Sequence, residues 1–232
     1  MTSNQVPGFL PSTSGFRFPN SFPDVPLRWI GIPGVLRMSI GHASNGLCGG
    51  MAFAARDYFE RGQSPPPDTE PPGEGPLFDY LVDRLFDSFD LPLGPARYLE
   101  LMNPLLGDGE SFWSRLGVVP HGRVRRMARD EWPKIRAEID GGHPCPLGLV
   151  RVTSTDPVDL KENHQVLTYG YQLDGGMLTL RLYDPNRPGR DDVSISLQTR
   201  PAAGAGPVTT APPGTRVYSF FRVAYRPAIP PP

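Results

Sequence analysis

The sequence predicts an α+β protein, and three features support this. Apolar residues with helical spacing lie mainly in the first 140 residues, and alternating apolar segments follow Pro146. Asp174-Gly175-Gly176 joins two of these later segments as a hairpin turn. Helices followed by antiparallel strands are typical of the α+β class. We expect one domain over residues 1–232, because 38% hydrophobic residues suffice for one sizeable core.

The helices are predicted from apolar periodicity and from capping residues. The first contains Cys48 and ends at Arg61-Gly62, where glycine can cap it. In the last, Asp130 is the predicted N-cap, with Pro133 in the first turn. The predicted helices cover residues 47–60, 77–89, 94–103, 110–116 and 130–139.

The strands are predicted from β-rich or alternating segments bounded by turn residues. They cover residues 147–152, 165–173, 177–183, 193–197 and 216–225, and residues 27–40 form a short strand or turn. The first 26 residues contain Phe16, Phe18 and Phe22 and are expected to form an extended arm across the body. Proline and glycine predict loops at 63–76 and 199–214 and a tail at 227–232.

Composition disfavours several classes of function. The 23 basic and 24 acidic residues nearly cancel, and no basic stripe interleaved with aromatic residues indicates nucleic-acid binding. The four histidines are scattered without metal-ligand spacing, so we expect no metal and no cofactor. No signal peptide and no apolar run of about 20 residues is evident, so a cytoplasmic protein without a membrane span is expected.

The candidate nucleophile is Cys48, at the start of the first long predicted helix. Unpaired N–H groups and the helix dipole favour a thiolate there, which is the form that attacks a carbonyl carbon. The alternative is that Cys48 serves only as a small buried apolar residue of the core. Cys145, between two prolines, is interpreted as structural. A Cys48–Cys145 disulfide would remove the nucleophile.

The second half of the candidate site follows from the predicted hairpin. Pairing about Gly175 joins positions whose numbers add up to about 350, so His164 lies near Asn186 and diagonal to Asp184. Even-numbered side chains then share a face. A carboxylate that orients an imidazole, which in turn faces a thiol, is a nucleophile–base–orienter arrangement. The alternative for each residue taken alone is that His164 is a partly exposed histidine at a strand end and that Asp184 forms a turn before Pro185.

These residues, in this order, resemble the papain-like cysteine peptidase superfamily. Gly142-His143-Pro144, His164-Gln165-Val166-Leu167, Tyr169-Gly170-Tyr171 and Leu182-Tyr183-Asp184-Pro185 are similar to the branch of bacterial double-glycine leader peptidases, over about residues 40–200. The resemblance implies an N-terminal helical lobe whose Cys-bearing helix packs on a C-terminal antiparallel sheet. It also implies Cys48 as nucleophile, His164 as general base and acid, and Asp184 as the orienting carboxylate.

One position departs from that family. His42 stands where the family usually has a glutamine that donates to the oxyanion. His42, Ser44 or Asn45 are the candidate substitutes, and Asn186 is a second candidate for the role of Asp184.

The leading hypothesis is a peptidase or amidase with a peptide or amide substrate. The alternatives are an acyltransferase or transglutaminase-like thiol enzyme and a non-catalytic binding protein. Away from the site, three groups of residues are interpreted as peripheral or structural. We expect two histidines to face solvent, His121 and His143. A solvated face is expected to carry the arginine run Arg123, Arg125, Arg126 and Arg129. Two tryptophans, Trp113 and Trp132, are expected in the core or in the wall of a cleft.

Overall fold

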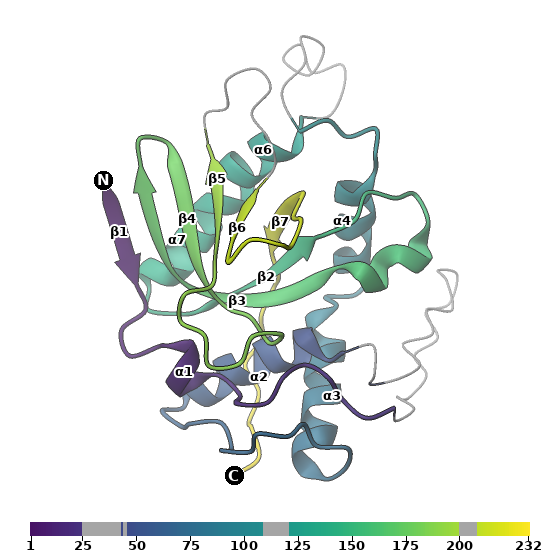
Figure 1. The fold of residues 1–232 in the computed structure, drawn as a ribbon, viewed down its shortest axis with the longest axis vertical. Helices are drawn as coiled ribbons and strands as arrows, with labels where there is room; N and C mark the ends of the chain where they lie inside the picture. Colours follow the sequence, from purple (N-terminus) through teal and green to yellow (C-terminus); the bar gives the residue numbers. More distant parts are fainter. Residues whose placement is uncertain (25–42, 44–45, 109–120, 200–207) are drawn as a thin grey trace.

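The computed structural model describes residues 1–24, 43, 46–108, 121–199 and 208–232. In these residues the protein is a mixed α+β fold with six α-helices and a seven-stranded antiparallel sheet. The strand order is β6-β5-β4-β3-β2-β7, and β1 pairs with β3 beside that path (Figure 1). The α+β prediction is therefore confirmed at the level of fold class.

The central strand β3 (His164–Asp174) organises the sheet. One of its edges is shared, because β2 pairs with residues 164–168 and β1 with residues 170–173. Its other edge pairs with β4 across the predicted hairpin turn. The remaining strands are β1 (Thr2–Gln5), β2 (Cys145–Val150), β4 (Met177–Tyr183), β5 (Ser194–Gln198), β6 (Thr209–Ala211) and β7 (Ser219–Arg222).

Three predicted helices are found with ends within a residue or so of the expected ones. They are α2 (Cys48–Glu60), α3 (Pro76–Ser88) and α4 (Leu93–Met102). The helix predicted at 110–116 and the strand or turn predicted at 27–40 lie outside the described residues.

The predicted start of the last helix is wrong. The chain is already helical before Asp130, through α6 (Arg123–Arg125) and the π-helical segment η2 (Arg126–Glu131), which runs directly into α7 (Trp132–Asp140). Asp130 therefore lies inside a helical segment and is no N-cap. Pro133 does lie in the first turn of α7, as predicted, directly after the π-helical segment.

The prediction of a solvated arginine face is wrong for Arg123. Its side chain is buried and donates to the carbonyl oxygens of Leu101 and Asn103, each at 2.8 Å, and pairs with Asp108 at 3.0 Å. A buried guanidinium is tolerated when its N–H donors find acceptors, and here the residues after α4 supply them.

The helix α2, which begins at Cys48, packs against both α3 and β3. Two glycines follow Cys48, and a Cβ on either would collide, Gly49 with the Ser88 hydroxyl and Gly50 with the Leu81 carbonyl. The Cys-Gly-Gly sequence thus lets the first turn of α2 approach α3 more closely than any larger side chain would allow.

The N-terminal arm lies across α2, as expected, and buried phenylalanines hold it there (Figure 1). The ring of Phe16 lies 6.0 Å from that of Tyr58 on α2, and the ring of Phe22 lies 6.3 Å from that of Phe78 on α3. The arm is not extended throughout, because it contains β1 and the one-turn helix α1 (Pro11–Ser14). The C-terminal tail also contacts α2, where Tyr58 donates to the Pro231 carbonyl at 3.0 Å.

Both cysteines are free thiols. Cys145 is fully buried at the start of β2, in keeping with its predicted structural role. Among the described residues, no helix has the length and apolar content needed to cross a bilayer.

Candidate active site

Cys48 is the first residue of α2 and is half-buried. Its sulfur accepts from the backbone N–H groups of Gly49 and Gln165 and forms a hydrogen bond with the side chain of His164. A thiol at this end of a helix also faces the positive end of the helix dipole. The surroundings of the sulfur therefore favour negative charge.

His164 and Asp184 share a face of the sheet because β3 contains a bulge. Nearer the turn, Leu173 faces Leu178 and Gly170 faces Arg181, but beyond Tyr169 the register shifts by one residue and Thr168 faces Leu182. A one-residue shift exchanges the two faces of a strand. The expectation that even-numbered residues face the same way therefore holds for His164 only because of this bulge.

The imidazole of His164 is held by Asp184. His164 Nε2 lies 2.7 Å from Asp184 Oδ1, and both side chains are largely shielded from water. Asp184 Oδ1 also accepts from the backbone N–H of Asn186 at 2.9 Å. Because Nε2 is engaged by Asp184, Nδ1 is the ring nitrogen left for the Cys48 thiol.

The ionisation of this group is coupled. Burial opposes a thiolate at Cys48, but the positive charge and hydrogen bond of His164 and the N–H groups of Gln165 and Gly49 outweigh it and lower the pKa of the thiol. Burial likewise opposes an imidazolium, yet the charge of Cys48 and the hydrogen bond to Asp184 raise the pKa of His164 to about 9. The arrangement therefore favours a thiolate–imidazolium pair over the neutral thiol and imidazole.

Asp184 is better placed than Asn186 to orient the imidazole. The amide nitrogen of Asn186 lies 3.4 Å from His164 Nε2, farther than the carboxylate oxygen of Asp184. Burial opposes ionisation of Asp184, but its hydrogen bond and attraction to His164 outweigh burial and lower its pKa.

Other predicted site residues do not join this cluster. His42, Ser44, Asn45 and Trp113 lie outside the described residues. Trp132 packs in the core against Tyr171, with ring centroids 4.8 Å apart. His143 is half-exposed and pairs with Glu60 at 2.9 Å. No group of three or more His, Cys, Asp or Glu side chains in the described part of the chain could hold a metal ion.

Two residues near the cluster were not singled out by the sequence. Tyr98, on α4, donates from its hydroxyl to the backbone carbonyl of His164 at 3.3 Å. Burial, followed by the charge of nearby Cys48, raises the pKa of Tyr98 well above its usual value. Asn20, on the N-terminal arm, accepts from the N–H of Leu47 at 2.6 Å. Neither residue belongs to a recognisable motif, and only the packing of α4 and of the arm brings them here.

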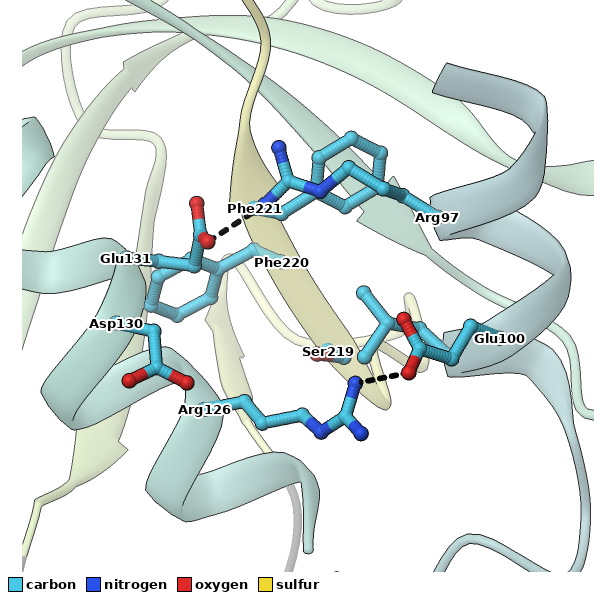
Figure 2. A pocket seen from close by; sticks show the side chains of 9 residues that line it. Arg97, Glu100, Arg126, Asp130, Glu131, Ser219, Phe220 and Phe221 are labelled. Atoms are coloured by element: carbon cyan, nitrogen blue, oxygen red, sulfur yellow. Dashed lines mark hydrogen bonds and ion pairs between the residues drawn. The ribbon is translucent and has the colours of Figure 1, made fainter. Parts of the chain in front are cut away.

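A separate polar cavity of about 140 Å³ lies between α4, η2 and β7 (Figure 2). Two ion pairs cross it, Arg97 with Glu131 at 2.5 Å and Arg126 with Glu100 at 2.7 Å. None of Cys48, His164 and Asp184 lines it. The four charged groups of these pairs are thus paired with one another.

Comparisons with known proteins gave no match: no family model, no curated protein and no solved structure resembles the chain closely enough to be identified.

Proposed function

We propose that the protein is a papain-like cysteine peptidase or amidase, with Cys48 as nucleophile, His164 as general base and acid, and Asp184 as the carboxylate that orients His164. The observation that carries this proposal is the linked set of contacts from the Cys48 sulfur to His164 and from His164 Nε2 to Asp184 at 2.7 Å. Its support is this geometry and the chain order of helix-borne Cys, strand-borne His and Asp one hairpin later.

The chemistry would proceed in two steps. The Cys48 thiolate attacks the carbonyl carbon of the substrate, and the His164 imidazolium gives its Nδ1 proton to the departing amine as the C–N bond breaks. A thioester then links the acyl group to Cys48. Neutral His164 next takes a proton from water, the resulting hydroxide attacks the thioester, and the acid is released with the thiol regenerated. Asp184 keeps Nε2 protonated and the ring oriented throughout.

The negatively charged oxygen that forms on the substrate carbonyl in each step needs hydrogen-bond donors to stabilise it. The N–H of Cys48, as first residue of α2, has no partner within the helix and is one such donor. The hydroxyl of Tyr98 is a second group near the sulfur, and it would donate to the oxyanion by turning its single proton away from the His164 carbonyl. The three residues proposed from sequence, His42, Ser44 and Asn45, stay candidates for the same role.

The experiment begins with reactivity. We expect iodoacetamide to modify Cys48 at pH 6 about tenfold faster than a free thiol, with the site identified by mass spectrometry. The larger thiolate fraction that follows from the lowered pKa is partly offset by the lower nucleophilicity of such a thiolate. Ordinary thiol reactivity at Cys48 would overturn the proposal.

Hydrolysis is tested with a peptide library. New peptide ends produced by the wild-type protein and absent with Cys48→Ala support a peptidase. If the acyl-enzyme forms but is released by added amines and not by water, acyl transfer replaces hydrolysis as the function. An activated thiol without any acyl-enzyme would favour a binding protein that keeps the fold.

A further inference from the structure

Asn20 connects the two sides of the candidate active site. Its side-chain oxygen accepts from the N–H of Leu47 at 2.6 Å, directly before the nucleophile. Its side-chain nitrogen donates to Asn186 Oδ1 at 3.1 Å, two residues after Asp184. Its own backbone N–H donates to the Pro185 carbonyl at 3.0 Å. One amide thus links the start of α2 to the loop that carries Asp184.

The arm holds Asn20 firmly in this place. Phe18 and Phe22, on either side of it in the sequence, are buried and their rings lie 6.0 Å apart. Gly46 approaches the Asn20 amide so closely that a Cβ there would lie 2.5 Å from the side-chain nitrogen, and its φ of +89° also favours glycine. The arm, the segment before Cys48 and the Asp184 loop therefore fit together around one side chain.

The same contacts determine which way the Asn186 amide points. The N–H of Leu47 requires an acceptor, so the oxygen of Asn20 faces it and its nitrogen faces Asn186. Asn186 then presents its oxygen to Asn20 and its nitrogen toward His164 Nε2, 3.4 Å away. With a donor in that position, Asn186 offers no rival acceptor for the Nε2 proton, which goes to Asp184.

We propose that Asn20 is a positioning residue of the active site, which ties the residue before Cys48 to the loop of Asp184 and so keeps the thiol, the imidazole and the carboxylate aligned. This inference rests on the proposed function of these three residues. The inference adds that the N-terminal arm helps to position the residues of the site, although the arm lies far from Cys48 and Asp184 in the sequence.

The experiment measures iodoacetamide modification of Cys48 from pH 4 to pH 10 in five proteins: wild type, Asn20→Ala, Asn186→Ala, the double variant of these two, and Ser21→Ala. In Asn20→Ala we expect the midpoint of the pH profile to rise and the rate at pH 6 to fall about threefold, with the rate at pH 10 unchanged. Asn186→Ala should shift the midpoint in the same direction. The double variant should shift the midpoint by less than the sum of the two single shifts, because both substitutions remove the same Asn20–Asn186 hydrogen bond.

Ser21→Ala is the matched control, since Ser21 is exposed on the same arm. A structural role alone would lower the thermal unfolding midpoint of Asn20→Ala without moving the pH profile, and that result overturns the inference. If Asn20→Ala does not fold, exposed Asn186 carries the test, and an unshifted profile in Asn186→Ala overturns it equally. Ordinary thiol reactivity in the wild type overturns the proposed function and this inference together, whereas an activated wild type with unshifted variants overturns only the role of Asn20.

Discussion

The two cysteines of this protein have the same side chain in opposite surroundings. Cys48 lies half-buried at the N-terminus of α2, beside His164 and two backbone N–H groups. Cys145 lies fully buried at the start of β2, where burial, followed by the charge of Glu138, raises the pKa of its thiol. The comparison shows that burial by itself suppresses ionisation, and that a cation and N–H donors aimed at the sulfur are needed to reverse it.

The largest expected effect is the loss of thiol reactivity when Cys48 is replaced, in contrast to replacement of Cys145. Cys48→Ala should abolish rapid iodoacetamide modification of the native protein and any hydrolysis. Cys145→Ser should leave both unchanged but lower the free energy of unfolding by about 1–3 kcal/mol, because it buries a hydroxyl, which is costlier to remove from water than a thiol. Mass spectrometry and urea unfolding measure the two effects. Rapid modification of Cys145 in the folded protein would contradict the comparison.

Removing the cation should make Cys48 more like an ordinary thiol. In His164→Ala we expect the rate of Cys48 modification at pH 6 to fall about tenfold, because the pKa of the thiol rises when the imidazolium is lost. At pH 10, where an ordinary thiol is also ionised, the rate should be close to that of the wild type. An unchanged rate at pH 6 would mean that the helix N-terminus alone activates the sulfur.

The pH dependence of the wild type should separate alkylation from hydrolysis. The pKa of His164 is raised to about 9, so the imidazolium is present below that pH and is lost as the pH rises through it. Cys48 stays ionised on that side, because its pKa is lowered. Hydrolysis should therefore decline above about pH 9, while alkylation does not. Parallel declines in both would contradict this prediction, because they would indicate unfolding of the protein and not loss of the general acid.

A smaller effect is expected at the orienting carboxylate. Asp184→Ala removes the acceptor of the His164 Nε2 proton and should lower Cys48 modification at pH 6 about fivefold. Asp184→Asn keeps a side-chain oxygen there and should lose less of the modification rate, since asparagine serves this role in papain-like proteases. Equal losses in the two variants would mean that the charge of Asp184 matters and its hydrogen bond does not.

The smallest effect on Cys48 alkylation is expected at Tyr98. Tyr98→Phe removes the hydroxyl that donates to the His164 carbonyl at 3.3 Å but keeps the ring against Phe221, with centroids 4.7 Å apart. We expect less than a twofold change in alkylation but about a tenfold fall in hydrolysis, since an oxyanion donor acts only in the acyl-transfer steps. Equal, small effects on both reactions would assign Tyr98 a packing role.

Much of the local structure follows from the sequence. Apolar periodicity located α2, α3 and α4, and the Gly175-Gly176 turn located the β3–β4 hairpin, because these signals act over neighbouring residues. At two places the local signals failed. The helical segments α6 and η2 precede α7 where the sequence predicted an N-cap at Asp130, and Arg123 is buried because acceptors from another segment surround it.

The sequence by itself determined which residues are available for chemistry: a cysteine opening a helix, a histidine opening a strand and an aspartate closing the next strand. Their alignment was decided by tertiary structure. The bulge at Tyr169 places His164 on the face of Asp184, and Asn20, on a separate arm, bridges the two sides. A single extra residue in a strand reverses its faces, and hydrogen bonds between distant segments leave no periodic pattern, so neither could be derived from local sequence.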